Sequence, residues 1–219
     1  FERYGNVSLR YVDSVGDLHQ PDMIILPGTK STIADLRWLR QCGLEAAIHK
    51  AADAGTLVFG VCGGYQMLGR TVSDPEQVEA AGTTEILGMG LLEMDTIFLG
   101  KKVQAQTTGV FAGISGVLSD LNGMSYSGYE IHMGRSEEEM PALAGTGNVY
   151  GSYVHGVFDA SGISDTILKA LCVRKGIDFD ALETFDVEAY KERQYDLLAD
   201  AVRSGLDMEF IYRALNREL

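Results

Sequence analysis

In the first third of the chain, continuous apolar runs alternate with segments in which apolar residues recur every three or four positions. Continuous apolar runs at 23–26 and 56–61 are typical of buried strands. Between them, a helix is expected to begin at Ser31 or Thr32, and a second helix has one apolar face. That face consists of Leu44, Ala47, Ile48, Ala51 and Ala52. Strand–helix–strand order with short connections predicts an α/β fold with a mostly parallel central sheet, flanked by helices on both faces.

The remaining two thirds predict strands and hairpins followed by helices. Strands and hairpins are expected over 88–152, a late strand at 149–158, a helix at 161–175, and one or two helices at 187–215. Residues 72–84 are expected to form a loop. The chain has no internal repeat, low-complexity tract or linker, so residues 1–219 are predicted to form a single domain.

Composition narrows the setting of this domain. The net charge of −13 argues against a nucleic-acid partner or an anionic membrane surface, because both would repel the chain. No apolar run is long enough to span a bilayer, and no secretory signal is visible. Cys42, Cys62 and Cys172 are widely spaced and form no metal-ligand pairs, so reduced thiols in the cytoplasm and no metal site are expected. Because Phe1 is not an initiator methionine, we expect a piece of a longer protein.

Cys62 stands where the apolar run at 56–61 ends and a short helical pattern begins. The glycines Gly63 and Gly64 follow it at once. A sharp strand-to-helix turn lifts its apex side chain out of a sheet, and adjacent glycines let the backbone turn and a substrate approach. The helix N-terminus favours the thiolate form of the cysteine. This arrangement is typical of a cysteine nucleophile.

An imidazole is the simplest base for such a thiol. His155 lies near the end of the late strand, and the carboxyl ends of parallel strands gather at one edge of a sheet, where ligands bind. Cys62 and His155 are therefore expected to meet there. His132 is a second candidate, although a hydrogen-bonded structural histidine would fit its position too. His19 and His49 are expected at the solvated surface.

Four ordered segments of this sequence carry a recognisable pattern. They are ILPGTKSTIADL at 25–36, CGGYQMLG at 62–69, GYEIHMG at 128–134 and GSYVHGVF at 151–158. Together they resemble the class I (triad-type) glutamine amidotransferases, and within that class they look like the cobyric acid synthase branch. The resemblance covers most of the chain and implies a flavodoxin-like fold with a nucleophile elbow.

The resemblance also implies an activity and partners. The chain would be a glutaminase domain that hydrolyses glutamine through a cysteine thioester. Its ammonia would pass to an ATP-dependent synthetase domain that amidates carboxylates of a corrinic acid in cobalamin biosynthesis. That synthetase domain would precede this one and is missing here, so the chain is expected to be a C-terminal fragment. ATP and magnesium are expected in the missing domain, and no cofactor is expected in this one.

Residue roles follow from the matched positions. Cys62 would attack the glutamine side-chain amide, and His155 would transfer protons. The backbone at Gly63, and at Gly28 or Thr29, matches the oxyanion-hole positions of the family. Gln66 matches a position near the bound substrate, although packing within its helix would explain it nearly as well.

One position departs from the pattern of most class I enzymes. They carry a glutamate two residues after the catalytic histidine, where this chain has Val157. The cobyric acid synthase branch is similar in lacking it. Glu130 and Asp159 are the candidates for an acid that orients His155, and the sequence does not choose between them. We therefore expect weak glutaminase activity in the isolated domain, stimulated by the synthetase domain.

Two alternatives stay open. The glutaminase could serve another acceptor, as in cobyrinic a,c-diamide synthase or in the amidation of peptidoglycan glutamate. A non-catalytic binding module with the same fold is the third hypothesis, and an intact Cys62 and His155 argue against it.

Overall fold

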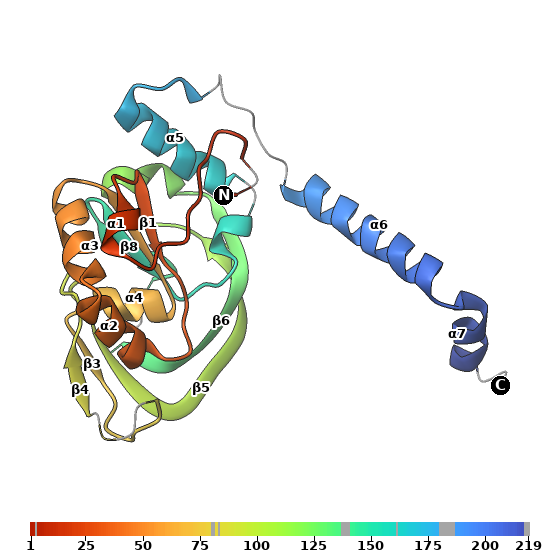
Figure 1. The fold of residues 1–219 in the computed structure, drawn as a ribbon, viewed down its shortest axis with the longest axis horizontal. Coiled ribbons are helices and arrows are strands. Elements are labelled where there is room, and N and C mark those ends of the chain that lie inside the picture. Colours follow the sequence, from red (N-terminus) through yellow and green to blue (C-terminus); the bar gives the residue numbers. More distant parts are fainter. Residues whose placement is uncertain are drawn as a thin grey trace. The chain divides into compact units, whose positions relative to one another are not determined.

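Three parallel strands form the centre of a sheet within residues 1–182. In a computed structural model, β1 (Met23–Leu26), β2 (Leu57–Val61), β8 (Val149–Ser152) and β7 (Ala144–Thr146) form one sheet in the order β1-β2-β8-β7 (Figure 1). The β1–β2 and β2–β8 pairs are parallel, and β7 pairs antiparallel with β8. The structure describes residues 1–2, 4–79, 82, 84–136, 141–160, 162–179 and 187–216, without the side chains of 101–102, 134–136 and 187–188.

Side chains of β2 alternate between two hydrophobic clusters. Val58 packs in one cluster with residues of α2 (Thr32–Gln41), α3 (Leu44–Asp53) and α4 (Gly63–Leu68). Leu57 and Phe59 belong to the other cluster, with residues of the 3-10 helix η1 (Gly116–Leu121) and of α5 (Ile163–Lys175). Successive strand residues point to opposite faces, so the two clusters cover the two faces of the sheet. The expected α/β fold, with helices on both faces of a mostly parallel sheet, is confirmed.

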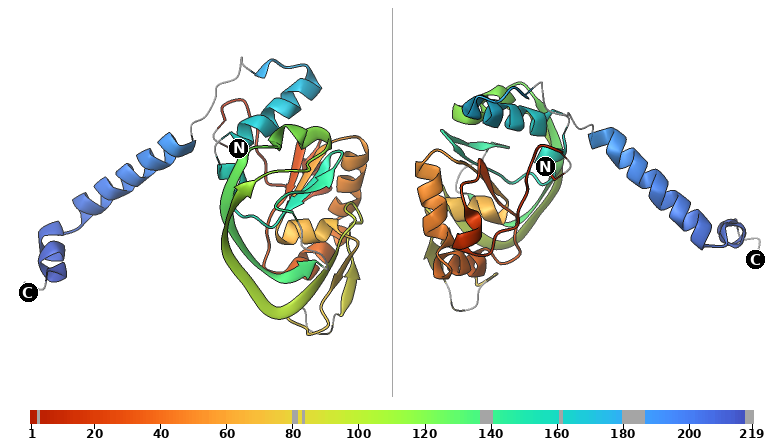
Figure 2. Two further views of the ribbon diagram at one scale, coloured as in Figure 1. Left: turned by 180° about the vertical axis from the view of Figure 1, so that it is seen from behind. Right: turned by 45° about the horizontal axis from the view of Figure 1, so that its top comes forward.

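A second sheet has the order β4-β3-β5-β6. Its strands are β4 (Glu85–Leu87), β3 (Thr71–Ser73), β5 (Asp95–Val110) and β6 (Ser125–Ser136). The last two pair antiparallel as a long curved ribbon, which Figure 2 shows from behind. This ribbon confirms that strands and hairpins occupy much of 88–152.

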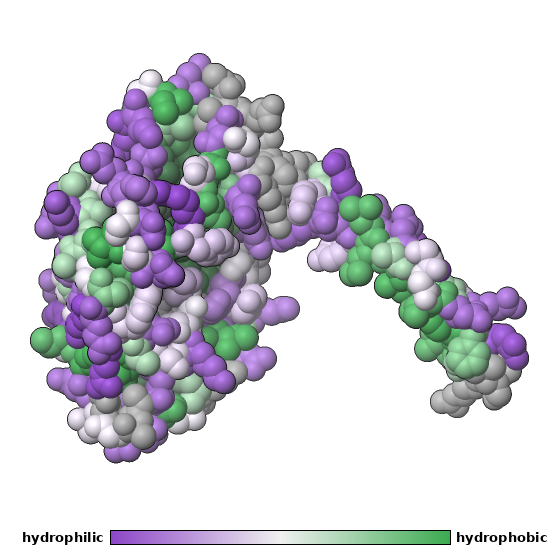
Figure 3. All heavy atoms as spheres, viewed as in Figure 1, coloured by the Kyte–Doolittle hydropathy of each residue, from purple (hydrophilic) through white to green (hydrophobic). Residues whose placement is uncertain are grey.

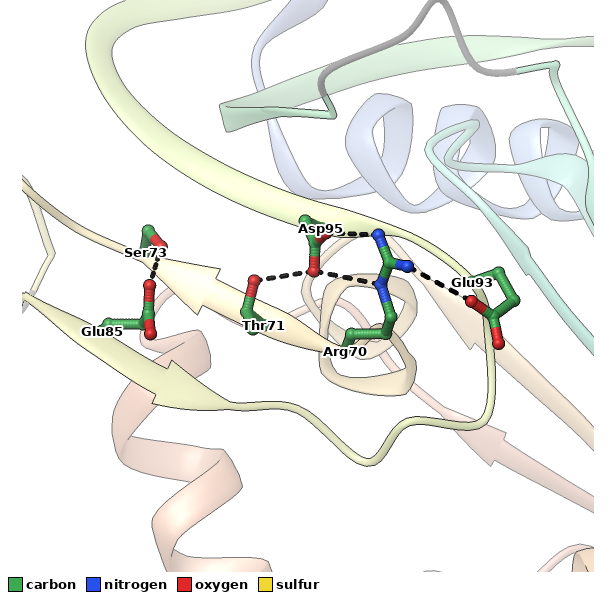
Figure 4. Close-up of polar contacts among 6 residues, drawn as sticks. All are labelled: Arg70, Thr71, Ser73, Glu85, Glu93 and Asp95. Carbon is green, nitrogen blue, oxygen red and sulfur yellow. Dashed lines mark hydrogen bonds and ion pairs between the residues drawn. The ribbon is translucent and has the colours of Figure 1, made fainter.

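Exposed polar contacts join the short strands of this second sheet (Figure 4). The Arg70 guanidinium donates to the Asp95 carboxylate at 2.5 Å and to Glu93 at 3.3 Å. Asp95 also accepts from the Thr71 hydroxyl at 2.7 Å, and these hydrogen bonds lower its pKa. Each exposed ion pair contributes at most about 1 kcal/mol, so the contacts align β3 and β5 rather than hold the fold together.

The chain divides into two compact units, residues 1–182 and 183–219, which are described separately. A short helix, α1 (Val15–Leu18), also lies in the first unit. The second unit consists of α6 (Val187–Gly205) and α7 (Met208–Leu215), where the sequence predicts one or two helices. Asp207 caps α7 by accepting from the Phe210 N–H at 3.0 Å. A single domain over residues 1–219 stays a prediction.

Three segments differ from their sequence prediction in where they begin or end. The strand expected at 149–158 ends at Ser152, because the Ser152 hydroxyl accepts the Val154 N–H at 3.0 Å and the chain turns out of the sheet. The expected loop at 72–84 begins inside β3, which pairs with β4 and β5. The helix expected from residue 161 begins at Ile163 in the structure, and residue 161 lies outside the described residues.

Candidate active site

The predicted site residues follow the carboxyl ends of three neighbouring parallel strands. Gly28 comes shortly after β1, Cys62 directly after β2, and His155 shortly after β8. Because these strands are parallel and adjacent, their carboxyl ends lie at one edge of the sheet. The edge that the sequence analysis expects to carry the chemistry therefore brings all three residues together.

A backbone conformation that is rare for a cysteine places Cys62 at the apex of a turn. Its φ is 51° and its ψ is −108°, outside the regions that side chains with a Cβ favour. The Cys62 N–H donates to the Ser152 carbonyl at 2.8 Å, and its carbonyl accepts from Gln66 N–H at 3.0 Å. One bond joins the turn to β8 and the other begins α4. Neighbouring structure thus holds the strained elbow on both sides.

Glycines allow this elbow to pack against β1. A methyl group at Gly64 would lie 2.1 Å from the Leu26 carbonyl oxygen. At Gly63 it would lie 2.6 Å from Thr29 Cγ2 and 3.1 Å from the Thr29 nitrogen. Only glycine fits at both positions. The close approach sets Gly63 beside Thr29, so the two predicted oxyanion-hole segments are neighbours.

Gly28 lies between the nucleophile and the histidine. A methyl group at Gly28 would be 3.1 Å from His155 Cε1 and 3.6 Å from Cys62 Cβ. Atoms of both residues therefore lie within 4 Å of one point. The ring and the thiol come from positions far apart in the sequence and converge on the same small space.

Burial keeps both members of this pair neutral. Desolvation raises the pKa of the Cys62 thiol, and the Gly63 N–H opposes that shift. The charges of Glu130 and Glu79 raise it further. For His155, desolvation and the nearby His132 lower the pKa, against the opposing effect of the Ile131 carbonyl. The helix N-terminus predicted to favour thiolate is outweighed by burial, so the resting pair is a thiol and a neutral imidazole.

Strand β6 supplies the groups that contact His155. The backbones of Tyr129 and His155 exchange two hydrogen bonds, at 3.2 and 2.8 Å. Their rings stack with centroids 5.1 Å apart and 5° between the planes. The Ile131 carbonyl also accepts from Cys62 Sγ at 3.5 Å. A single strand of the second sheet thus contacts both the nucleophile and the base.

The two candidate orienting acids have different surroundings. Glu130 Oε2 lies 3.4 Å from His132 Nε2, and the His132 ring stacks on Tyr153 with centroids 4.1 Å apart. Asp159 is exposed at the end of the 3-10 helix η2 (Val157–Asp159). Its N–H donates to the Gly156 carbonyl at 2.9 Å. Glu130 therefore reaches the site through His132, and the backbone of Asp159 takes part in the turn that follows His155.

Two side-chain nitrogens at this edge are buried without a hydrogen-bond partner among the described residues. They are Nε2 of His155 and Nε2 of Gln66. The Gln66 Oε1 accepts from the Thr32 hydroxyl at 3.1 Å, and only 2% of the residue is exposed. Unpaired buried polar groups are costly and are typical of sites that complete their hydrogen bonds with a ligand.

Sequence reasoning missed Glu79. Its carboxylate accepts the Thr32 N–H and, at 3.3 Å, the Ile33 N–H, so it satisfies two free donors at the start of α2. Burial raises the pKa of Glu79 despite these bonds. The residue lies in no recognisable motif, and the contact spans 47 positions, so no local signal points to it. Its effect is to fix the segment that follows Gly28.

A cysteine on a strained elbow beside a histidine is the arrangement of an enzyme with a cysteine nucleophile, and comparison with known proteins identifies its class. Residues 1–163 match the CobB/CobQ-like glutamine amidotransferase domain, and the chain belongs to this family. A crystal structure of a glutamine amidotransferase shares the fold, with a TM-score of 0.52 and 18% identity over 78% of this chain and 88% of that one.

Curated relatives are longer than this chain. The cobyric acid synthase of Lachnoclostridium phytofermentans is 49% identical, covering 98% of this chain and 46% of that protein. The cobyric acid synthase of Ruminiclostridium cellulolyticum is 44% identical, covering 95% of this chain and 44% of that protein. The chain thus spans about half the length of these relatives. Within the part of the chain that the structure describes, no helix has the length and apolar character needed to cross a bilayer.

Proposed function

We propose that this chain is the glutaminase part of a cobyric acid synthase. The observation that carries the proposal is the convergence of Cys62, on a strained elbow, with His155 and Gly28 at one sheet edge. The 49% identity to a cobyric acid synthase over 98% of the chain supports the choice of acceptor.

Hydrolysis proceeds through a thioester. The neutral His155 ring takes the Cys62 proton as sulfur attacks the amide carbon of the glutamine side chain. The tetrahedral intermediate then collapses, and His155 returns the proton to nitrogen as the carbon–nitrogen bond breaks and ammonia leaves. A water molecule, deprotonated by the same ring, attacks the thioester, releasing glutamate and restoring the thiol.

Backbone donors stabilise the oxyanion of the intermediate. The Gly63 N–H lies directly after the nucleophile, and the backbone at Gly28 or Thr29 lies beside it. Donors held in a water-poor site stabilise developing charge without reorganising. Gln66 would offer its unpaired Nε2 to the bound glutamine.

In place of an acidic side chain, a backbone carbonyl of β6 orients the His155 ring. The Ile131 carbonyl acts on the His155 ring, while the stacked Tyr129 ring restricts its rotation. Glu130 contributes through His132. A carbonyl carries less charge than a carboxylate, so it stabilises the imidazolium less. We therefore expect the isolated chain to hydrolyse glutamine weakly and the rest of the enzyme to stimulate it.

The rest of the enzyme would be an ATP-dependent synthetase that precedes this chain. It would use ATP and magnesium to activate carboxylates of a corrinoid acid and receive ammonia from Cys62. We place the enzyme in the cytoplasm, where the free thiols of Cys42, Cys62 and Cys172 stay reduced.

Labelling with diazo-oxo-norleucine, an electrophilic glutamine mimic, tests the glutaminase activity. The purified chain should gain one adduct, located on Cys62 by mass spectrometry, and should release glutamate from glutamine. The Cys62→Ser variant should lose both, while Cys42→Ser, a matched control away from the site, should keep both. A folded chain with no adduct would favour the non-catalytic binding module.

The acceptor is tested in the full-length protein. Glutamine-dependent amidation should occur with the diamide substrate of cobyric acid synthases. Turnover only of the less amidated corrinoid, or only of peptidoglycan glutamate, would move the chain to one of the alternative enzymes while leaving the glutaminase mechanism intact.

A further inference from the structure

The second unit carries an apolar stripe along one face of α6. Tyr195, Leu198 and Val202 of α6 and Leu206, directly after its last residue, are between 41% and 62% exposed. The Leu206 N–H donates to the Val202 carbonyl at 3.1 Å, so Leu206 continues the helical turn. The spacing of three or four residues places all four on the same side of a helical axis. Figure 3 shows hydrophobic side chains gathered along α6 and α7. We call these four residues the α6 stripe.

Helix α7 continues the exposed apolar character. None of its residues is buried, and Phe210, Tyr212 and Leu215 are exposed. Burying such side chains away from water stabilises a folded protein or a complex. Single exposed apolar residues are normal on a surface, but a contiguous apolar face with a polar rim indicates an interaction site.

The polar side of α6 shows that the stripe is confined to one face. Asp200 and Arg203 form an ion pair at 3.5 Å on the exposed surface, and neither position falls on the stripe. Leu197 is 58% exposed but is turned well away from Leu198 and Val202 by the helical repeat. It provides an exposed leucine outside the stripe on the same helix.

The greater length of the related synthases points to a partner surface for the α6 stripe. The glutaminase family match ends at residue 163, before α6 begins. Alignments with whole cobyric acid synthases cover 95–98% of this chain, so they include α6. These relatives also contain a further half that this chain does not. The two helices therefore belong to the synthase beyond its glutaminase core.

We propose that α6 and α7 dock into an apolar groove on the other half of the synthase and hold the glutaminase against it. The inference rests on the proposed function and adds the surface through which the two activities meet. A helix laid by its apolar face into a groove is a recurrent mode of recognition. A second copy of this chain is the less favoured occupant, because two chains of net charge −13 repel each other.

The test uses the full-length synthase with Leu198→Gln and Val202→Gln together. Glutamine keeps helix propensity while removing the apolar contact. Glutamine-dependent amidation should fall at least about tenfold, because loss of central apolar contacts typically weakens an interface by that factor or more. Amidation with added ammonia and basal glutamine hydrolysis should both be kept. Leu197→Gln is the matched control and should leave all three rates unchanged.

Further measurements keep the result interpretable. Circular dichroism should show unchanged helix content in the double variant, and Leu198→Met, which stays apolar, should keep coupling. Unchanged glutamine-dependent amidation in the helical double variant would overturn the docking proposal. A dimer of this chain in sedimentation that the double variant abolishes would overturn it too, in favour of a second copy. Absence of glutamine hydrolysis in every protein, wild type included, would instead reject the proposed function.

Discussion

Helices α4 and α7 are both short, but they differ completely in burial. All six residues of α4 are buried, whereas no residue of α7 is. Helices of this length are unstable alone in water, so each depends on packing. Helix α4 obtains its contacts within the chain, from β1 and β8, because glycines let the backbones approach closely. Among the described residues of α6 and α7, Tyr195, Leu198 and Phe210 stay more than half exposed. The elbow helix is thus packed within the first unit, and the docking proposal assigns the apolar residues of the second unit to another surface.

Of the substitutions considered, Gly64→Ala should lower the free energy of unfolding most. The added methyl group would meet the Leu26 carbonyl oxygen at 2.1 Å, and a backbone atom has little room to move. We expect the free energy of unfolding to fall by about 3 kcal/mol, measured by urea denaturation.

The matched control is Gly205→Ala at the end of α6. No atom lies within 4 Å of the added group, so the change should be below about 1 kcal/mol and in the stabilising direction. Equal effects of the two substitutions would show that α4 is not packed more tightly than α6.

Tyr129 and Tyr195 sharpen the comparison, since both are exposed aromatics, at 48% and 62%. Only Tyr129 has a described ring contact with the base, stacking on His155. We expect Tyr129→Ala to lower kcat for glutamine hydrolysis roughly 10- to 100-fold, because a loosened base is poorly aligned. Tyr129→Phe should retain the rate, and KM should change little in either variant. Tyr195→Ala should leave kcat unchanged in the isolated chain. Full activity in Tyr129→Ala would refute the positioning role of this ring.

Local patterns were sufficient to predict the elements around the site. The apolar runs before Gly28 and Cys62 identified two parallel strands, and the paired glycines after Cys62 identified the elbow. Placing His155 with them required only that a third parallel strand end beside it, which β8 does. The spacing of apolar residues and the glycines of a turn are local features, so a single sequence is enough to recognise them.

Contacts made across long separations could not be predicted in this way. Whether Tyr129 lies over His155 depends on the bridge between β6 and the segment after β8, which belong to different sheets. Glu79 reaches the start of α2 through a loop with no periodicity. The protonation state of Cys62 depends on a competition between burial and a helix terminus, and only the folded structure supplies the degree of burial.

The pH dependence of hydrolysis should arise wholly within the first unit, because all four histidines lie there. His155 must be neutral to accept the Cys62 proton, and its pKa is lowered from 6.5 by burial and by His132. The acid limb of kcat/KM should therefore lie below pH 6.5, with activity rising as pH increases through the pKa of His155. In His132→Gln one positive neighbour is lost, which raises the pKa of His155. The limb should move to higher pH, while burial still holds it below the ordinary histidine value. His49→Gln, on α3, is the control and should leave the profile unchanged. A shift to lower pH in His132→Gln would mean that this ring does not act on His155 through its charge.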